Sequence, residues 1–347
     1  MATRILVASY TTSVQTLIFD PLTSTLTTHS AVQVGHHPSW IEFYPSDHSL
    51  VFACVETTEG KIVALKYDDS GNGSVVAESP SGGADPCHLA ATKDELFVAN
   101  YSSGSLSVIP IASHHPYLLQ GCVVTPLHGS GPNLERQTSP HAHQVLLSDG
   151  ELLVADLGAD RVCRFSQRDG AWILQGQVQY APGSGPRHTA VYDGALYTLN
   201  ELDSTLSKHR FPTLPTAPSL IAVKSTMLNP PALPRDMLAA ELLIPPPNST
   251  FSVLYAYVSN RNNPSPDGDT IAIFSIAGDD LELVAEISTG LKHLRGMVFG
   301  GPEDKWLVAG GAEGGGVKIF ERIDGGKGLK LLAEDSSVEA PTGFLWV

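Results

Sequence analysis

Arginine, histidine and glutamate side chains recur in this sequence at places where they could bind an anion and move a proton. The chain has only eleven arginines in 347 residues, and three of them, Arg187, Arg261 and Arg295, lie beside short apolar runs. Two or three guanidinium groups can hold a carboxylate or phosphate through paired hydrogen bonds. His141 and Glu201, beside similar runs, are the available acid and base groups. These side chains predict a site for a small anionic substrate.

Two other interpretations of the same residues stay open. Arg187 and Arg261 could pair with Glu201 and nearby aspartates as a structural ion network. His141 and His143 lie two residues apart on an expected strand, so both imidazoles face one side and could suit a metal. No third ligand has evident spacing to complete a zinc site. The expected site therefore contains no metal and no cofactor.

Short β-strands are the elements expected to position these residues. Two kinds of β-rich run alternate along the chain, and the second kind recurs at intervals of 44–60 residues. The first kind, strand A, usually begins beside a proline and covers residues 38–43, 86–91, 140–145, 186–191, 238–244, 294–299 and 341–347. The second kind, strand B, ends in a small or polar residue and covers residues 5–9, 51–55, 96–100, 152–156, 196–200, 256–260 and 306–310.

The offset between the two series predicts how the chain closes. The first B run has no A run before it, and the last A run has no B run after it. Units of this length, each a four-stranded sheet, are typical of β-propellers, whereas two β-sandwiches would need coincidental spacing. We therefore expect one all-β domain over residues 1–347, a seven-bladed β-propeller closed by pairing of its N- and C-terminal strands. Residues 211–250 hold nine of the 25 prolines and are expected to be an insertion or an elongated outer strand within it.

In such a ring, two sets of residues meet at one mouth of the central channel. Blade strands are antiparallel, so the start of each A strand and the end of each B strand lie at the same end. The position beside the A-strand start holds Ser39, Cys87, His141, Arg187, Ala240, Arg295 and Thr342. The position after the B strand holds Tyr10, Glu56, Tyr101, Leu157, Glu201, Arg261 and Gly311. The charged members of both sets are expected to lie close together.

Composition excludes several partners. The net charge of −15 argues against a nucleic acid or an anionic membrane surface. No apolar run approaches the roughly 18 residues of a membrane-spanning helix, and 42% hydrophobic residues favour a large folded core over disorder. The four cysteines are far apart and the N-terminal run is typical of a strand rather than a signal peptide, so a cytoplasmic setting is expected. The oligomeric state has no signal in the sequence.

Several motifs resemble those of a known family. They are Ser139-Pro-His-Ala-His143, Gly185-Pro-Arg-His188, Leu199-Asn-Glu201, Val258-Ser-Asn-Arg261 and Asp156-Leu-Gly-Ala-Asp-Arg161. Over essentially its whole length the chain resembles the seven-bladed β-propeller lactonases, whose members include 6-phosphogluconolactonases and the fungal 3-carboxy-cis,cis-muconate cyclase. The resemblance implies a metal-free site of one histidine, two arginines and one glutamate. On this sequence they fall on His141, Arg187, Arg261 and Glu201.

The residues and the resemblance favour a cofactor-free lactonase that hydrolyses a sugar-acid lactone such as 6-phosphogluconolactone at the channel mouth. Arg187 and Arg261 would hold the anionic group or the oxyanion, and His141 or Glu201 would activate water. The further candidates for substrate contact are Arg295, Tyr101, Glu56 and His143. A lactonising 3-carboxy-cis,cis-muconate cycloisomerase is the alternative enzyme. A non-catalytic propeller scaffold is the alternative from another class.

Overall fold

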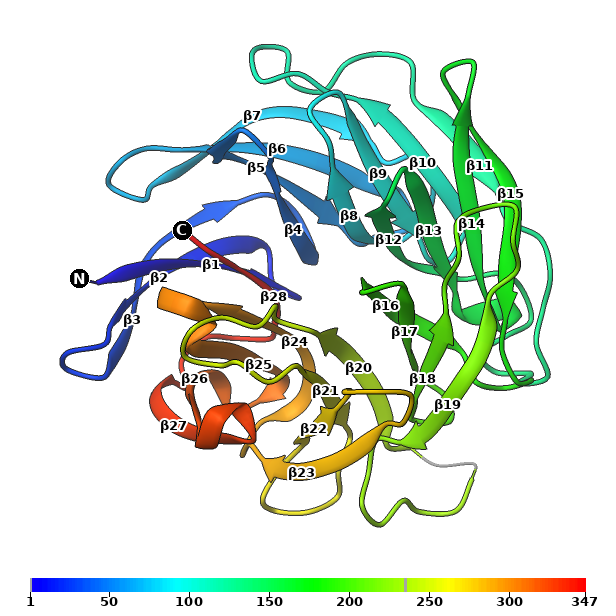
Figure 1. The fold of residues 1–347 in the computed structure, drawn as a ribbon. Helices are drawn as coiled ribbons and strands as arrows, with labels where there is room; N and C mark the ends of the chain where they lie inside the picture. Colours follow the sequence, from blue (N-terminus) through cyan, green and yellow to red (C-terminus); the bar gives the residue numbers. More distant parts are fainter. Residues whose placement is uncertain (1, 234–235) are drawn as a thin grey trace.

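The short β-rich runs of the sequence become strands in the computed structural model, which describes residues 2–233 and 236–347. Seven antiparallel four-stranded sheets surround a central axis (Figure 1). The only helical elements in the described ranges are three single turns of 3-10 helix, at Leu157–Ala159, Pro302–Asp304 and Asp324–Gly326. The predicted all-β, seven-bladed propeller is confirmed.

Each sheet presents one strand to the central axis and pairs it with the next strand outward. The innermost strands are β28 (Pro341–Trp346), β4 (Pro38–Tyr44), β8 (Pro86–Ala91), β12 (Ala142–Ser148), β16 (Pro186–Tyr192), β20 (Leu238–Leu243) and β24 (Lys292–Gly300). Their partners are β1 (Thr3–Ser9), β5 (Asp47–Val55), β9 (Glu95–Asn100), β13 (Glu151–Asp156), β17 (Ala195–Asn200), β21 (Tyr255–Arg261) and β25 (Trp306–Gly314). These two sets coincide with the A and B runs of the sequence.

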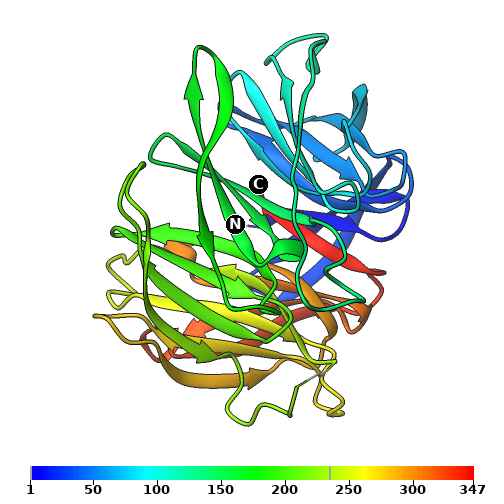
Figure 2. The same ribbon diagram turned by 90° about the vertical axis from the view of Figure 1, so that its right-hand side faces the viewer.

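Two further strands complete each sheet toward the rim (Figure 1). Figure 2 shows the same sheets from the side. The third strands are β2 (Ser13–Asp20), β6 (Lys61–Tyr67), β10 (Ser105–Pro110), β14 (Arg161–Arg168), β18 (Thr205–Arg210), β22 (Thr270–Ser275) and β26 (Gly316–Ile323). The outer strands are β3 (Thr25–Gln33), β7 (Gly73–Pro80), β11 (Val123–Pro126), β15 (Ala171–Gln179), β19 (Ser219–Ser225), β23 (Glu282–Ser288) and β27 (Gly328–Asp335).

The ring closes where the two ends of the chain meet. β28 pairs antiparallel with β1, so that Leu6 lies opposite Leu345 and Val7 opposite Phe344. Both termini therefore lie on one sheet (Figure 1). The C-terminal strand thus supplies the innermost strand of the sheet that the N-terminus begins, as the offset between the two series predicts.

The apolar core lies between neighbouring sheets rather than inside the channel. Ile5, Leu17 and Phe19 of the closing sheet pack with Trp306 and Val308 of the adjacent sheet, and all five side chains are buried. The Phe19 and Trp306 rings meet edge to face, with centroids 5.0 Å apart. Similar clusters join the other sheets. Because each sheet buries both faces against its neighbours, the inner strand ends are held firmly around the axis.

The proline-rich range 211–250 contributes strands to two sheets. It contains the outer strand β19 and the inner strand β20, with loops before, between and after them. The first loop is fastened by Arg164, whose Nη1 donates to the Thr216 carbonyl at 3.0 Å, and by Glu151, which accepts the Leu214 N–H at 3.0 Å. Residues 234 and 235 of this range lie outside the described residues.

The described residues contain neither a disulfide bond nor a membrane-spanning helix. All four cysteines are unpaired; Cys122 is exposed and the other three are buried. Within the ranges that the structure describes, no helix has the length and apolar character needed to cross a membrane.

Candidate functional site

A β-bulge at the beginning of each inner strand sets the residues that face the channel mouth. A bulge leaves one residue outside the regular strand pairing and redirects its side chain. In β16, for example, Pro186 pairs with Asn200 and His188 with Leu199, which leaves Arg187 between them. The residues at the bulges are Ser39, Cys87, His143, Arg187, Ala240 with Glu241, His293, Arg295 and Thr342.

The strand register corrects one assignment made from the repeat. In β12, Ala142 pairs with Asp156 and Gln144 with Ala155, so His143 is the bulged residue. His143 is therefore the structural equivalent of Arg187, whereas the sequence repeat placed His141 there. The reason is that Pro140 precedes the strand, and Ala142 takes the first paired position that proline occupies in β16. His141 lies two residues before the bulge.

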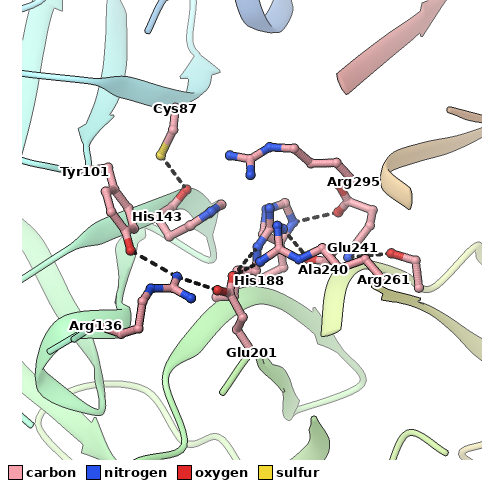
Figure 3. Close-up of polar contacts among 12 residues, drawn as sticks. Cys87, Tyr101, Arg136, His143, His188, Glu201, Ala240, Glu241, Arg261 and Arg295 are labelled. Carbon is pink, nitrogen blue, oxygen red and sulfur yellow. Dashed lines mark hydrogen bonds and ion pairs between the residues drawn. The ribbon is translucent and has the colours of Figure 1, made fainter. Parts of the chain in front are cut away.

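Glu201 lies at the centre of the site and binds three guanidinium groups. Its Oε2 accepts from Arg187 Nε at 2.9 Å and from Arg261 Nη2 at 2.8 Å, and its Oε1 accepts from Arg136 Nη2 at 2.6 Å (Figure 3). The Glu201 side chain is only 1% exposed. Arg136 also donates to the Tyr101 hydroxyl at 3.3 Å. The ion network that the sequence left open between Arg187, Arg261 and Glu201 is present, with Arg136 as an additional member.

The three arginines keep Glu201 ionised. Burial alone would raise the pKa of its carboxyl, but the charges of Arg261, Arg187 and Arg136 outweigh burial and lower the pKa to about 2. Arg187 has a second partner, because its Nη1 also donates to the Ala240 carbonyl. Burial lowers the pKa of Arg187 to about 10, so this guanidinium remains charged at neutral pH.

Arg261 and Arg295 have less complete sets of protein partners. The Nε of Arg261 is buried and has no hydrogen-bond partner among the described residues. Arg295 Nη2 lies 3.8 Å from Glu56 Oε1, and its guanidinium lies 5.2 Å from the centre of the Tyr10 ring. Buried N–H donors are costly unless an acceptor reaches them. These two arginines can therefore accept an anionic ligand.

A cavity of about 360 Å³ lies over this cluster and carries an excess of positive charge. Its lining comprises Glu56, Tyr101, Arg136, His143, Glu201, Leu238, Arg261, His293 and Arg295. With Arg187 behind Glu201, four guanidinium groups face two carboxylates. In a protein with a net charge of −15, this is a local positive site. Its size and charge suit a small anionic molecule.

The histidines of the site differ in their surroundings. Burial, reinforced by Arg187, holds the pKa of His143 well below its usual range, so this imidazole is neutral. His141 is partly exposed and stacks on the Tyr101 ring with centroids 4.4 Å apart, while its Nδ1 lies 3.0 Å from the Tyr101 carbonyl. His141 is absent from the cavity lining. His141 therefore lies beside the site, in contact with Tyr101, and does not line the cavity.

Beneath the arginines, His188 and Glu241 form a second buried pair. His188 Nδ1 lies 2.6 Å from Glu241 Oε1, and both side chains are almost fully buried. Burial raises the pKa of Glu241 to about 8, and burial together with Arg187 lowers the pKa of His188 well below its usual range. Glu241 therefore remains protonated at neutral pH and does not reduce the positive charge above it.

A wider cavity of about 750 Å³ opens beside the first and shares Arg136, Leu238 and His293 with it. Its wall is mostly amides and carboxylates, the groups that hydrogen-bond sugar hydroxyls. Those side chains are Asn133, Glu135, Asp236, Asn262, Asn263, Asp269 and Glu313. The site is therefore a cationic inner cavity joined to an outer cavity lined by amides and carboxylates.

Sequence reasoning placed Arg187, Glu201, Arg261, Arg295, Tyr101, Glu56 and His143 in this site, and the structure brings them together. It missed Arg136 and His293. Arg136 lies in the long loop between β11 and β12, which has no counterpart in the repeat. His293 lies two residues before Arg295 in the same strand, at an additional bulge between Lys292 and Leu294 that the repeat does not show. Among the described residues, no group of three or more histidine, cysteine, aspartate or glutamate side chains is arranged to hold a metal.

Comparison with known proteins agrees with this architecture. The family described as Lactonase, 7-bladed beta-propeller matches residues 4–346. The chain is 29% identical over 293 residues to the 6-phosphogluconolactonase of Bacillus subtilis, which covers 82% of this chain and 79% of that one. It is 26% identical over 358 residues to a protein of Arthroderma benhamiae named a probable 6-phosphogluconolactonase, covering 98% of this chain and 88% of the relative.

Solved structures share the same ring of blades. The periplasmic gluconolactonase of Pseudomonas aeruginosa superposes with a TM-score of 0.85 and covers 100% of this chain and 99% of that one. At 22% identity, this likeness concerns the fold alone. The family match extends over nearly the whole ring, including every strand that contributes to the cavity. The chain belongs to the seven-bladed β-propeller lactonase family.

Proposed function

We propose that this protein is a lactonase that opens the ring of an anionic sugar-acid lactone, of the 6-phosphogluconolactone class, in the cationic cavity. The observation that carries the proposal is the excess of arginine over carboxylate around that cavity. A phosphate group brings a charge of about −1.5 to −2 at neutral pH, which matches this excess. The names of the two sequence relatives support the same substrate class.

The geometry divides the arginines into two roles. Arg261 and Arg295, which line the cavity, bind the anionic group or the oxyanion that forms when water adds to the lactone carbonyl. Arg187 acts as a positioning residue, since it is buried behind Glu201 and its bonds to Glu201 and Ala240 are already made. Glu201 fixes the guanidinium groups around it. A carboxyl with a pKa of about 2 is a poor proton acceptor at neutral pH.

Paired assays test the proposal against its alternatives. The purified protein should hydrolyse 6-phosphogluconolactone faster than glucono-δ-lactone, with acid release followed at constant pH and the spontaneous rate subtracted. It should leave 3-carboxy-cis,cis-muconate unchanged, because none of the relatives described above is named a cyclase. Activity only on the muconate would establish the cycloisomerase. A protein inactive on all three compounds would favour the scaffold.

Replacing Arg261 by lysine should lower kcat/KM for the lactone about tenfold or more. Lysine keeps the positive charge but loses the planar fork, and a charge-assisted bond to a buried anion contributes about 1.5–3 kcal/mol. Steady-state kinetics on 6-phosphogluconolactone measures the loss. The matched control is Arg168→Lys, since the exposed Arg168 side chain donates to Gln175 Oε1 and lines neither cavity. Equal kinetics in the two variants would remove Arg261 from the substrate site.

Exhaustive treatment with a chelator should leave the lactonase activity unchanged within about twofold. The described residues near the cavity supply arginine and histidine donors but no cluster with the spacing of metal ligands. The assay compares protein dialysed against EDTA with untreated protein. Loss of activity that zinc, calcium or magnesium restores would contradict this prediction.

A further inference from the structure

His293 lies where the inner and outer cavities meet, and it lines both of them. Resting on the lactonase function proposed above, we propose that His293 is the general base that activates the attacking water, with Asn262 and Glu313 orienting its ring. A lactone whose anionic group is held by Arg261 and Arg295 would extend toward this junction. His293 is therefore placed beside the inner binding groups and on the side open to water.

The hydrogen bonds of His293 define which ring nitrogen can accept a proton. Its Nδ1 lies 2.8 Å from Asn262 Oδ1 and 3.4 Å from Glu313 Oε1, both of which only accept. The amide orientation of Asn262 is fixed on its other side, because Nδ2 donates to the Asp236 carbonyl at 3.0 Å. The proton of neutral His293 therefore resides on Nδ1. Nε2 keeps its lone pair, and no described residue hydrogen-bonds to it.

Histidines that act as catalytic bases are commonly paired with a hydrogen-bond acceptor, as His293 is paired with Asn262 and Glu313 here. A third group that accepts from one ring nitrogen holds the imidazole in the tautomer whose other nitrogen can take a proton. Glu313 is largely exposed, so it adds a modest electrostatic contribution, while the Asn262 bond defines the geometry. Asn262 is a positioning residue, and His293 is the group expected to touch water.

Asn262 and His293 both have left-handed backbone conformations, and a buried aspartate fixes the segments that contain them. Asn262 has a φ of 63° and His293 a φ of 56°, in the left-handed region that most residues avoid but that asparagine and histidine enter more readily. Asp269, only 1% exposed, fastens both segments, accepting from the Asn263 N–H at 2.8 Å and from the Leu294 N–H at 2.7 Å. Asp269 thereby fixes the backbone on both sides of the hydrogen bond between Asn262 and His293.

The other candidate bases are less well placed. Glu201 is held ionised by three arginines, and both of its oxygens are occupied. His141 lies outside the cavity lining, stacked on Tyr101. His143 lines the cavity but is almost fully buried, and no described residue hydrogen-bonds to its Nδ1 to fix the ring. His293 alone among these four combines access to both cavities with a defined tautomer.

The electrostatic surroundings make this base depend on the substrate. Burial and the charges of Arg261, Arg295 and Arg187 lower the pKa of His293 to about 4, so the free protein carries it neutral and weakly basic. The groups that face it are Arg261, Arg295, Arg187, Lys292, Glu201, Asp269 and Glu313. An anion bound to the arginines cancels part of their repulsion, which raises the basicity of Nε2. The substrate would thereby activate the base that attacks it.

The proposed step balances in atoms and protons. Nε2 takes a proton from water while the water oxygen bonds to the lactone carbonyl carbon, and the carbonyl oxygen becomes an oxyanion. Collapse of this intermediate breaks the bond from the carbonyl carbon to the ring oxygen. The imidazolium returns its proton to that ring oxygen, which leaves as the hydroxyl of the open acid. The new carboxylic acid then loses a proton to solvent.

The first experiment compares His293→Gln with the wild type on 6-phosphogluconolactone. We expect kcat to fall by about 10²–10⁴, with little change in KM, since glutamine can hydrogen-bond but cannot take the proton. Calorimetry with the product, 6-phosphogluconate, should show binding within about threefold of wild type, which verifies an intact site. The control is His48→Gln, because His48 is exposed, stacks on Phe43 and lines neither cavity.

The outcomes separate the two proposals. An active wild type with an equally active His293→Gln variant overturns the role of His293 alone. A wild type that hydrolyses none of the lactones overturns the proposed function and His293 as its base together.

The second experiment needs no turnover, and its deciding measurements use the wild-type protein. Nitrogen NMR of the wild-type histidines should show His293 as the Nδ1–H tautomer at pH 7, with a pKa that rises when inorganic phosphate is added. Asn262→Leu should weaken that tautomer preference. The Nε2–H tautomer in the wild type, or a pKa that phosphate leaves unchanged, would overturn the proposal.

Discussion

Deletion of Pro341–Val347 should leave a chain that no longer folds to a stable ring. The missing strand pairs with β1 and packs against β24 and β4, so its loss exposes the edge of β1 and opens the ring between two sheets. It also removes Phe344 and Trp346 from the cluster around Phe19. Truncating one buried aromatic costs about 3–5 kcal/mol, against a total stability of about 5–15 kcal/mol for a typical domain. We expect no cooperative thermal transition by circular dichroism.

A circular permutant provides the matched control for this deletion. Opening the chain at the exposed Asp169-Gly170 turn between β14 and β15, with a short linker joining the native ends, keeps every strand and the closed ring. The permutant should melt cooperatively. A deletion variant with a melting temperature within a few degrees of wild type would show that β28 is dispensable.

Replacing Glu201 by glutamine should destabilise the protein by about 3–5 kcal/mol at pH 7 and abolish most of its lactonase activity. The substitution leaves Arg187, Arg261 and Arg136 without their shared counter-ion, and an unpaired buried charge is far more costly than the pair is favourable. Activity falls because Arg261 loses the bond that fixes it. Urea denaturation measures the stability change. The control is Glu78→Gln, whose half-exposed pair with Lys61 should contribute less than about 1 kcal/mol.

The same carboxyl makes wild-type stability depend on pH in a defined direction. The folded protein lowers the pKa of Glu201 from 4.5 to about 2, so its contribution is complete above pH 4.5 and is lost as the pH falls toward 2. A shift of that size corresponds to about 3 kcal/mol. Glu201→Gln should therefore show a smaller loss of stability than wild type between pH 4.5 and 2. Parallel acid denaturation curves would contradict the assignment.

The ring could be predicted from sequence because it depends on local patterns. Strand B runs end in small or polar residues, and most A runs begin at a proline, which lacks the N–H that a strand interior needs, so both kinds of boundary can be recognised in the sequence. Closure of the ring could be predicted because the first B run has no A run before it and the last A run has no B run after it. The charged residues that end B strands, such as Glu201 and Arg261, could be placed for the same reason.

The rest of the site depends on register and on loops, which the repeat does not encode. A single displaced proline, Pro140, was enough to exchange His141 for its neighbour His143 at the bulge. Arg136 comes from a loop without strand periodicity, and it reaches Glu201 only because the fold brings a residue 65 positions away beside it. His293 required the additional bulge of β24 between Lys292 and Leu294 and the left-handed backbone at that residue. No residue type marks the additional bulge or the left-handed backbone, so neither can be recognised from the sequence.

The residues that can contact a ligand lie at bulges, and they are different from the residues that pair the strands and pack the sheets. A side chain at a bulge lies outside the ladder of strand hydrogen bonds, so exchanging it leaves the pairing intact. Small residues occupy the bulge on some blades, as Ser39, Ala240 and Thr342 do, while large charged residues occupy others. A scaffold of nearly equivalent blades thereby acquires a polarity across its face, and a bound molecule can be held in only one orientation. Exchangeable bulge positions on all seven blades offer a route by which related rings diverge in substrate while their strands stay the same.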